Sequence, residues 1–184
     1  MKNVVIKFGL ISGAVSAALM LATTPFVYKI GFDYGFYIGS AGMLIAFLLV
    51  FFGIRSYRDN VLNGEISFLR ALGVGLLITL ISTVCYVITW EFVYFMLLPD
   101  FADKLAAHTL TKMQNAGKTT QEIAAMTEQM KQFKAMFDNP VTNALFAFIE
   151  PLPIGLFVTI VSSIILRKRR SNPPQNEVSA PVAS

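Results

Sequence analysis

Two carboxylic acids stand inside strongly apolar stretches of the chain, and they are the side chains best placed to do chemistry. Glu91 lies in the segment 89–95 (TWEFVYF), and Glu150 directly precedes Pro151 and is followed shortly by Pro153. An acid at membrane depth is costly, so it commonly marks an ion or proton path or a specific partner. Two such carboxyl groups, together with free backbone carbonyls, can hold a cation or pass a proton.

Other reactive side chains are sparse. Cys85 is the only cysteine and His108 the only histidine, so an intrachain disulfide and a thiolate metal site are both impossible. The zinc-protease spacing His-x-x-Glu-His and the signatures of serine nucleophiles are absent from the sequence. We therefore expect a protein without catalytic residues, metal or cofactor, and not an enzyme.

The composition indicates an integral membrane protein. Hydrophobic residues make up 55% of the 184 residues and charged residues only 14%, whereas soluble domains carry about 25% charged residues. The apolar residues come in blocks, and about 20 such residues span a hydrocarbon core of ~30 Å. The sequence predicts an all-α protein with four transmembrane helices, at about 8–28, 36–54, 71–98 and 141–166. The first block also fits a cleaved signal peptide, but its length and the lack of a small-x-small cleavage site favour a retained span.

The polar stretch 99–140, between spans three and four, predicts a helical hairpin broken at Gly117. Thr119 and Glu122 match the capping box that opens a helix. An amphipathic stripe follows, which favours intramolecular packing over a partner. Its members recur at threes and fours: Ile123, Met126, Met130, Phe133 and Phe137. Asp138 or Asn139 can cap the next helix, with Pro140 at its first position.

The basic residues predict the orientation. Four spans put both termini on one side of the membrane, and nine basic residues fall there: Lys2, Lys7, Arg55, Arg58, Arg70, Arg167, Lys168, Arg169 and Arg170. The other side has six, and every arginine is on the first side. The positive-inside rule makes that side cytoplasmic and the hairpin extracytoplasmic. Because these residues flank apolar blocks, they indicate a lipid bilayer as the partner and not nucleic acid. We expect one membrane domain, 1–170, and a disordered cytoplasmic tail, 171–184.

The two prolines predict a kink in span four. A helix starting only after Pro151 would have about 15 residues and reach about 23 Å, which is too short to cross. The span should therefore begin near Pro140 and be kinked at Pro151 and Pro153. Each proline lacks an amide hydrogen and so leaves a carbonyl four residues earlier, at Ala147 or Ile149, without its helical partner.

The depth of the two acids suggests a paired site. Glu91 lies seven residues before the outer end of span three, on the order of 10 Å deep by helix rise, and we expect Glu150 at a comparable depth. One hypothesis is that Glu91 and Glu150 form an ion or proton site. The alternative is that Glu150 ties the kinked backbone to a neighbour and Glu91 belongs to an interfacial aromatic belt with Tyr86, Trp90 and Tyr94.

Several stretches resemble a bacterial family, seen mostly in Bacteroidota, that is defined only as the domain of unknown function 4199 family. The matching stretches are YRDNVLNGEISFLRALGVGLLITLIS (57–82), PDFADKL (99–105), MTEQMKQFKAMFDNP (126–140) and IEPLPIGLFVTIVSSIILRKR (149–169). The resemblance covers nearly everything but the tail. It implies a four-span bacterial membrane protein and brings no activity, cofactor or catalytic residue.

Two functions are consistent with the sequence. The first is a small, non-enzymatic inner-membrane protein that assembles with itself or with another membrane protein. The second is an oligomeric carrier or channel-like protein that moves ions or protons through Glu91 and Glu150.

Overall fold

The computed structural model describes residues 1–168. The predicted tail 171–184 and two of the basic residues, Arg169 and Arg170, lie outside the described residues. Within residues 1–168 every regular element is a helix, and the only extended pairing is an isolated bridge between Ile66 and Lys168. Four helices are long and apolar enough to cross a membrane. The prediction of an all-α membrane protein with four spans is confirmed.

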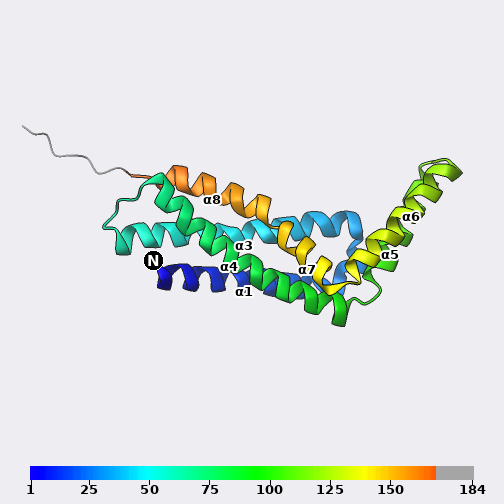
Figure 1. The fold of residues 1–184 in the computed structure, drawn as a ribbon, viewed down its shortest axis with the longest axis horizontal. Helices are drawn as coiled ribbons and strands as arrows, with labels where there is room; N and C mark the ends of the chain where they lie inside the picture. Colours follow the sequence, from blue (N-terminus) through cyan, green and yellow to red (C-terminus); the bar gives the residue numbers. More distant parts are fainter. Residues whose placement is uncertain (169–184) are drawn as a thin grey trace, which may run out of the picture.

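The four spans form a bundle, and a helical hairpin projects from one end of it (Figure 1). We call this the hairpin end. The N-terminus, the α3–α4 loop and the last turn of α8 lie at the opposite end. In chain order the elements are α1 (Lys2–Thr23), η1 (Thr24–Phe26), α2 (Val27–Ile30), α3 (Phe32–Val61), α4 (Phe68–Phe92), η2 (Val93–Leu97), α5 (Phe101–Asn115), α6 (Thr120–Phe137), α7 (Pro140–Ile149) and α8 (Leu152–Leu166).

The helices of the spans extend beyond the apolar blocks. The candidate spans run over Lys2–Ile30, Phe32–Val61, Phe68–Leu97 and Pro140–Leu166. The first changes to a 3₁₀ turn at Pro25, because proline cannot donate the hydrogen bond that an α-helix needs. The third ends in a π-helical turn, η2, which the sequence did not predict.

Small residues set the close packing around α4, which lies at the centre of the bundle. Gly9 and Gly13 of α1 face the side chains of Ile81 and Cys85. Gly75 of α4 faces Thr159 of α8 in the same way. In lipid, helices associate through close van der Waals contact, and small residues at the interface permit it. Gly9 and Gly13, four residues apart, therefore let α1 approach α4 closely.

The hairpin-end half of α3 has no such neighbour. Gly35 and Gly39 repeat the spacing of four, yet nothing lies within 4 Å of the place where a Cβ would be. Tyr37 beside them is 70% exposed. Spacing alone therefore does not identify a packed face.

The last span is divided into two helices. α7 ends at Ile149 and α8 begins at Leu152, with Glu150 and Pro151 in the turn between them. α7 packs on α4, whereas α8 packs on both α3 and α4. Pro151 and Pro153 have no amide hydrogen and cannot donate to the carbonyls of Ala147 and Ile149.

Local signals fix the hairpin. Thr119 and Glu122 form the reciprocal capping box at the start of α6, and Asn139 caps α7 with Pro140 in its first turn; both predictions are confirmed. The α6 stripe is half-buried, from Ile123 to Phe137. Lys112 of α5 also forms an exposed ion pair with Asp33 of α3, at 2.8 Å.

Candidate functional site

Three aromatic residues of the third span face the broken fourth span. Tyr86, Trp90 and Tyr94 are spaced by four, so they lie on one side of the helix, about 6 Å apart along its axis. Each donates a hydrogen bond to a polar side chain of the segment 138–150. We call these three hydrogen-bonded pairs the polar seam.

The deepest pair of the polar seam joins Tyr86 to Glu150. The Tyr86 hydroxyl donates to Glu150 Oε2 at 3.0 Å. Tyr86 is buried, and it lies near the middle of the span Phe68–Leu97. Glu150 occupies the turn between α7 and α8 and is exposed on the surface of the bundle. The proline break thus holds a carboxyl group near mid-span with one hydrogen-bond donor beside it.

The second pair joins Trp90 to Asn143. The Trp90 indole N–H donates to Asn143 Oδ1 at 2.7 Å, and Asn143 Nδ2 donates to the Phe137 carbonyl at 2.8 Å. Asn143 is fully buried. Its amide therefore connects α4, α7 and the end of α6. Asn143 was not predicted as a site residue, although an amide inside an apolar block is a signal of interhelical hydrogen bonding.

The third pair lies at the hairpin end, where the Tyr94 hydroxyl donates to Asp138 Oδ1 at 3.0 Å. Tyr94 is buried, while Asp138 is exposed at the end of α6. The polar seam therefore runs from an exposed acid at Asp138 to the mid-span acid at Glu150. Part of the predicted aromatic belt, the set Tyr86, Trp90 and Tyr94, faces another helix.

Glu91 is not part of the seam. It follows Tyr86 by five residues, which places it about 7.5 Å further along α4 and about 140° around the helix. The expectation that Glu91 and Glu150 lie at one level is wrong, because the Tyr86 contact holds Glu150 deeper in the bundle. The Oε1 atom of Glu91 is buried and has no hydrogen-bond partner among residues 1–168.

Buried hydroxyl groups continue the polar contacts beyond the seam. Thr79 and Thr159 hydrogen-bond at 3.1 Å between α4 and α8. Ser12 of α1 bonds Ser82 at 2.9 Å and donates to the Ala46 carbonyl at 2.8 Å. These pairs join α1, α3, α4 and α8 near the middle of the bundle, and their contacts are those of structural ties.

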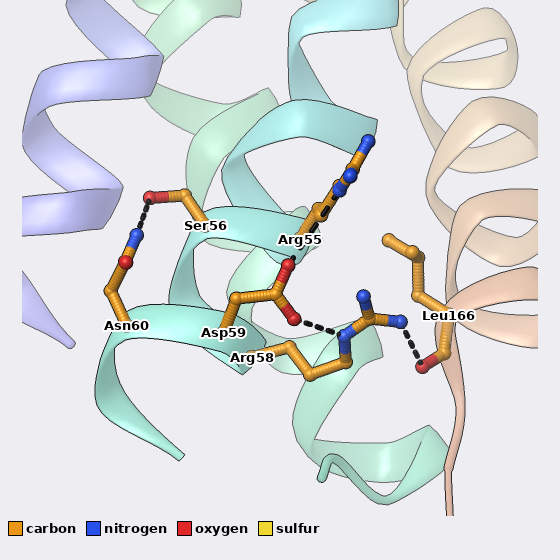
Figure 2. Close-up of polar contacts among 6 residues, drawn as sticks. All are labelled: Arg55, Ser56, Arg58, Asp59, Asn60 and Leu166. Atoms are coloured by element: carbon orange, nitrogen blue, oxygen red, sulfur yellow. Dashed lines mark hydrogen bonds and ion pairs between the residues drawn. The ribbon is translucent and has the colours of Figure 1, made fainter. Parts of the chain in front are cut away.

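The end opposite the hairpin holds a cluster of charged groups (Figure 2). Arg58 donates to Asp59 at 2.6 Å and to the carbonyl of Leu166 at 3.4 Å, so it caps the last turn of α8. Arg55 lies 3.6 Å from Asp59. The backbones of Ile66 and Lys168 pair nearby, with Ile66 N–H donating to the Lys168 carbonyl. The cluster ties the α3–α4 loop to the end of α8.

The seam places one titratable group, the Glu150 carboxyl, beside the Tyr86 hydroxyl near mid-span. This carboxyl group can hold a proton or accept a hydrogen bond from a partner. Among the described residues, no three His, Cys, Asp or Glu side chains come together as a metal site would require. Cys85 is half-buried against Gly13.

Comparison with known proteins gives the family. Neither the curated proteins nor the solved structures contain a match to this chain. The family described as "Protein of unknown function (DUF4199)" matches residues 7–168, which include the hairpin, the seam and all four spans except the first few residues of the first span. The resemblance noted in the sequence is thus confirmed, and the chain belongs to the DUF4199 family.

Proposed function

We propose that the protein is a non-enzymatic inner-membrane assembly protein, in which Glu150 is the contact for a second membrane helix. The observation that supports this is the exposure of Glu150 on the bundle surface near the middle of a span. A carboxyl group that faces hydrocarbon is costly unless polar groups surround it. Tyr86 supplies one donor, and a partner helix or a second copy supplies the rest.

The proposed orientation puts both termini in the cytoplasm and the hairpin outside. Its support is the distribution of arginines, all of which lie at the end of the bundle with the N-terminus or follow the last span. In this orientation α5 and α6 display charged side chains to the external solution.

The test is the mass of the assembly in native membranes after chemical crosslinking. The unmodified protein is expected to give one discrete species larger than the monomer. Glu150→Leu removes the carboxyl group and should reduce that species about tenfold, since a hydrogen bond to a charged group contributes about 1.5–3 kcal/mol. Glu128→Gln, a change at an exposed hairpin acid, should leave it unchanged. A monomer in the unmodified protein, or an unaffected Glu150→Leu assembly, contradicts the proposal.

A second candidate function is proton or cation translocation by an oligomer, which the polar seam favours. The acids Asp138 and Glu150 mark its two ends, and Tyr94, Trp90, Asn143 and Tyr86 provide hydrogen-bonding groups between them. Successive pairs are about 6 Å apart along α4, so bridging water would have to complete the path. Glu91 lies off this path, and a role for it requires a neighbouring subunit.

Proton flux into liposomes tests this candidate. Glu150→Gln should abolish the flux, because an amide cannot take up and release a proton. Tyr86→Phe should lower it, because phenylalanine has no hydroxyl to donate to Glu150. Equal flux in Glu91→Gln and the unmodified protein would exclude Glu91 from the path. Flux that persists at the original rate in Glu150→Gln would exclude the seam itself.

A further inference from the structure

A shallow apolar groove runs along the outside of the bundle between α4 and α7. Its volume is about 340 Å³. It is lined by Val84, Val87 and Ile88 of α4 and by Val141, Ala144 and Phe148 of α7, among others. Ile88 is 66% exposed and Val141 is 77% exposed. The groove is therefore open to the hydrocarbon, on the side of α7 away from buried Asn143.

Glu91 lies on the groove-lining face of α4, one turn beyond Ile88 toward the hairpin end. It follows Val84 by seven residues, Val87 by four and Ile88 by three, the spacing of side chains on one helical face. The Trp90–Asn143 hydrogen bond fixes the register of α7 against α4. This register brings the first turn of α7, with Val141, to the level of Glu91. The groove thus leads away from Glu91 toward the middle of the bilayer.

The carboxyl group of Glu91 has an unsatisfied hydrogen-bond acceptor. Its Oε1 atom is buried and unpartnered among residues 1–168. The only basic residue of α4 is Arg70, about 30 Å away along the helix by its rise, and α7 contains none. A buried carboxyl oxygen without a partner costs free energy. A donor from outside these two helices would remove that cost.

We propose that the groove binds a phospholipid with a primary ammonium headgroup, whose ammonium donates to Glu91 while an acyl chain lies along Val84, Ile88 and Ala144. The headgroup faces Glu91 near the end of the span, and the acyl chain follows the apolar groove toward the middle of the bilayer, as in a lipid of the surrounding leaflet. Glu91 lies about 9 Å from the end of the span at Leu97, so the bound ammonium lies about that far inside the end of the span. A quaternary ammonium has no N–H to donate, and a glycerol headgroup has no positive charge. Both should bind less well.

The experiment is native mass spectrometry of the full chain in detergent. The probes are phosphatidylethanolamine, phosphatidylcholine and phosphatidylglycerol with identical acyl chains. The unmodified protein should retain phosphatidylethanolamine about tenfold better than the other two, as one charge-assisted hydrogen bond implies. Glu91→Gln should remove that preference, and Glu150→Gln, which changes the other acid inside a span, should keep it. No preference in the unmodified protein, an intact preference in Glu91→Gln, or equal loss in both variants would overturn the proposal.

A second pair of variants tests the groove separately from the carboxyl group. Ala144→Phe fills the groove and should lower the retention of phosphatidylethanolamine. Ala41→Phe adds the same side chain to an exposed position of α3 and should not. Helical circular dichroism confirms that both variants are folded. Full retention in folded Ala144→Phe shows that the acyl chain lies elsewhere and refutes the site.

Discussion

At the scale of single residues, Gly155 sets how closely α8 approaches α4. A Cβ at this position would overlap the methyl group of Thr79 and lie 3.2 Å from the ring of Phe47. We expect Gly155→Ala to lower the free energy of unfolding by about 1–3 kcal/mol, the usual cost of overpacking. Thermal unfolding in detergent measures the effect. Gly39→Ala is the control, because nothing lies within 4 Å of its added methyl group. Equal losses of unfolding free energy in the two variants would show that Gly155 does not set the approach of α8 to α4.

Asn143 is the residue on which the polar seam depends most. Replacing it with alanine leaves both the Trp90 indole N–H and the Phe137 carbonyl without their partner. We expect Asn143→Ala to cost about 1–3 kcal/mol of stability, the cost of leaving a buried polar group unpaired. Adding Trp90→Phe removes the orphaned donor, so the double variant should lose less than the sum of the two single losses. Strict additivity would show that the hydrogen bond contributes nothing.

At the scale of elements, the start of α6 is a pH-dependent helix terminus. Lys118 Nζ donates to Glu122 at 2.9 Å, and the Thr119 N–H donates to the same carboxylate. These hydrogen bonds lower the pKa of Glu122 to about 2, and the bond from Lys118 has the largest effect. A lowered pKa in the folded state stabilises this terminus above the unfolded pKa of about 4.3. That contribution is lost as the pH falls from there toward 2.

Hydrogen exchange of the first α6 amides measures this loss. Protection should fall between pH 4.5 and pH 2 after correction for intrinsic exchange rates. Glu122→Gln should remove this pH dependence, because an amide cannot titrate. A pH-dependent decrease of the same size in the variant would assign it to another group.

The spans and the hairpin could be predicted from the sequence, because their signals are local. Blocks of apolar residues predict the spans, the Thr119–Glu122 spacing predicts the capping box, and Asn139-Pro140 predicts the start of α7. The seam could not be predicted in this way. The partners Tyr86 and Glu150, or Trp90 and Asn143, depend on the register between two helices, which apolar periodicity does not set. The glycines of α1 and α3 have the same spacing, and only the tertiary packing distinguishes them.

At the scale of the whole molecule, aromatic contacts hold the hairpin on the bundle. The Phe101 ring lies 5.5 Å from Phe32, 5.6 Å from Trp90 and 6.2 Å from Tyr94, measured between ring centroids. We expect Phe101→Ala to detach the hairpin, with amide exchange in 101–137 about tenfold faster and exchange in α8 unchanged, since local openings differ in free energy. Asp33→Asn, which breaks an exposed ion pair to Lys112, should have a much smaller effect. A larger effect of Asp33→Asn would assign the attachment to charge.

The division of the last span has a mechanical consequence. α7 is joined to the hairpin through Asn139 and the Asn143–Phe137 hydrogen bond, whereas α8 is held by α3, α4 and the Arg58 contact at the far end. A force applied to the hairpin would therefore act on α7 first. The hinge about which α7 turns relative to α8 would be at Glu150 and Pro151. Such a movement would strain the Trp90–Asn143 and Tyr86–Glu150 hydrogen bonds together, so a pull on the external arm would reach the intramembrane acid while the Arg58 end of α8 keeps its place.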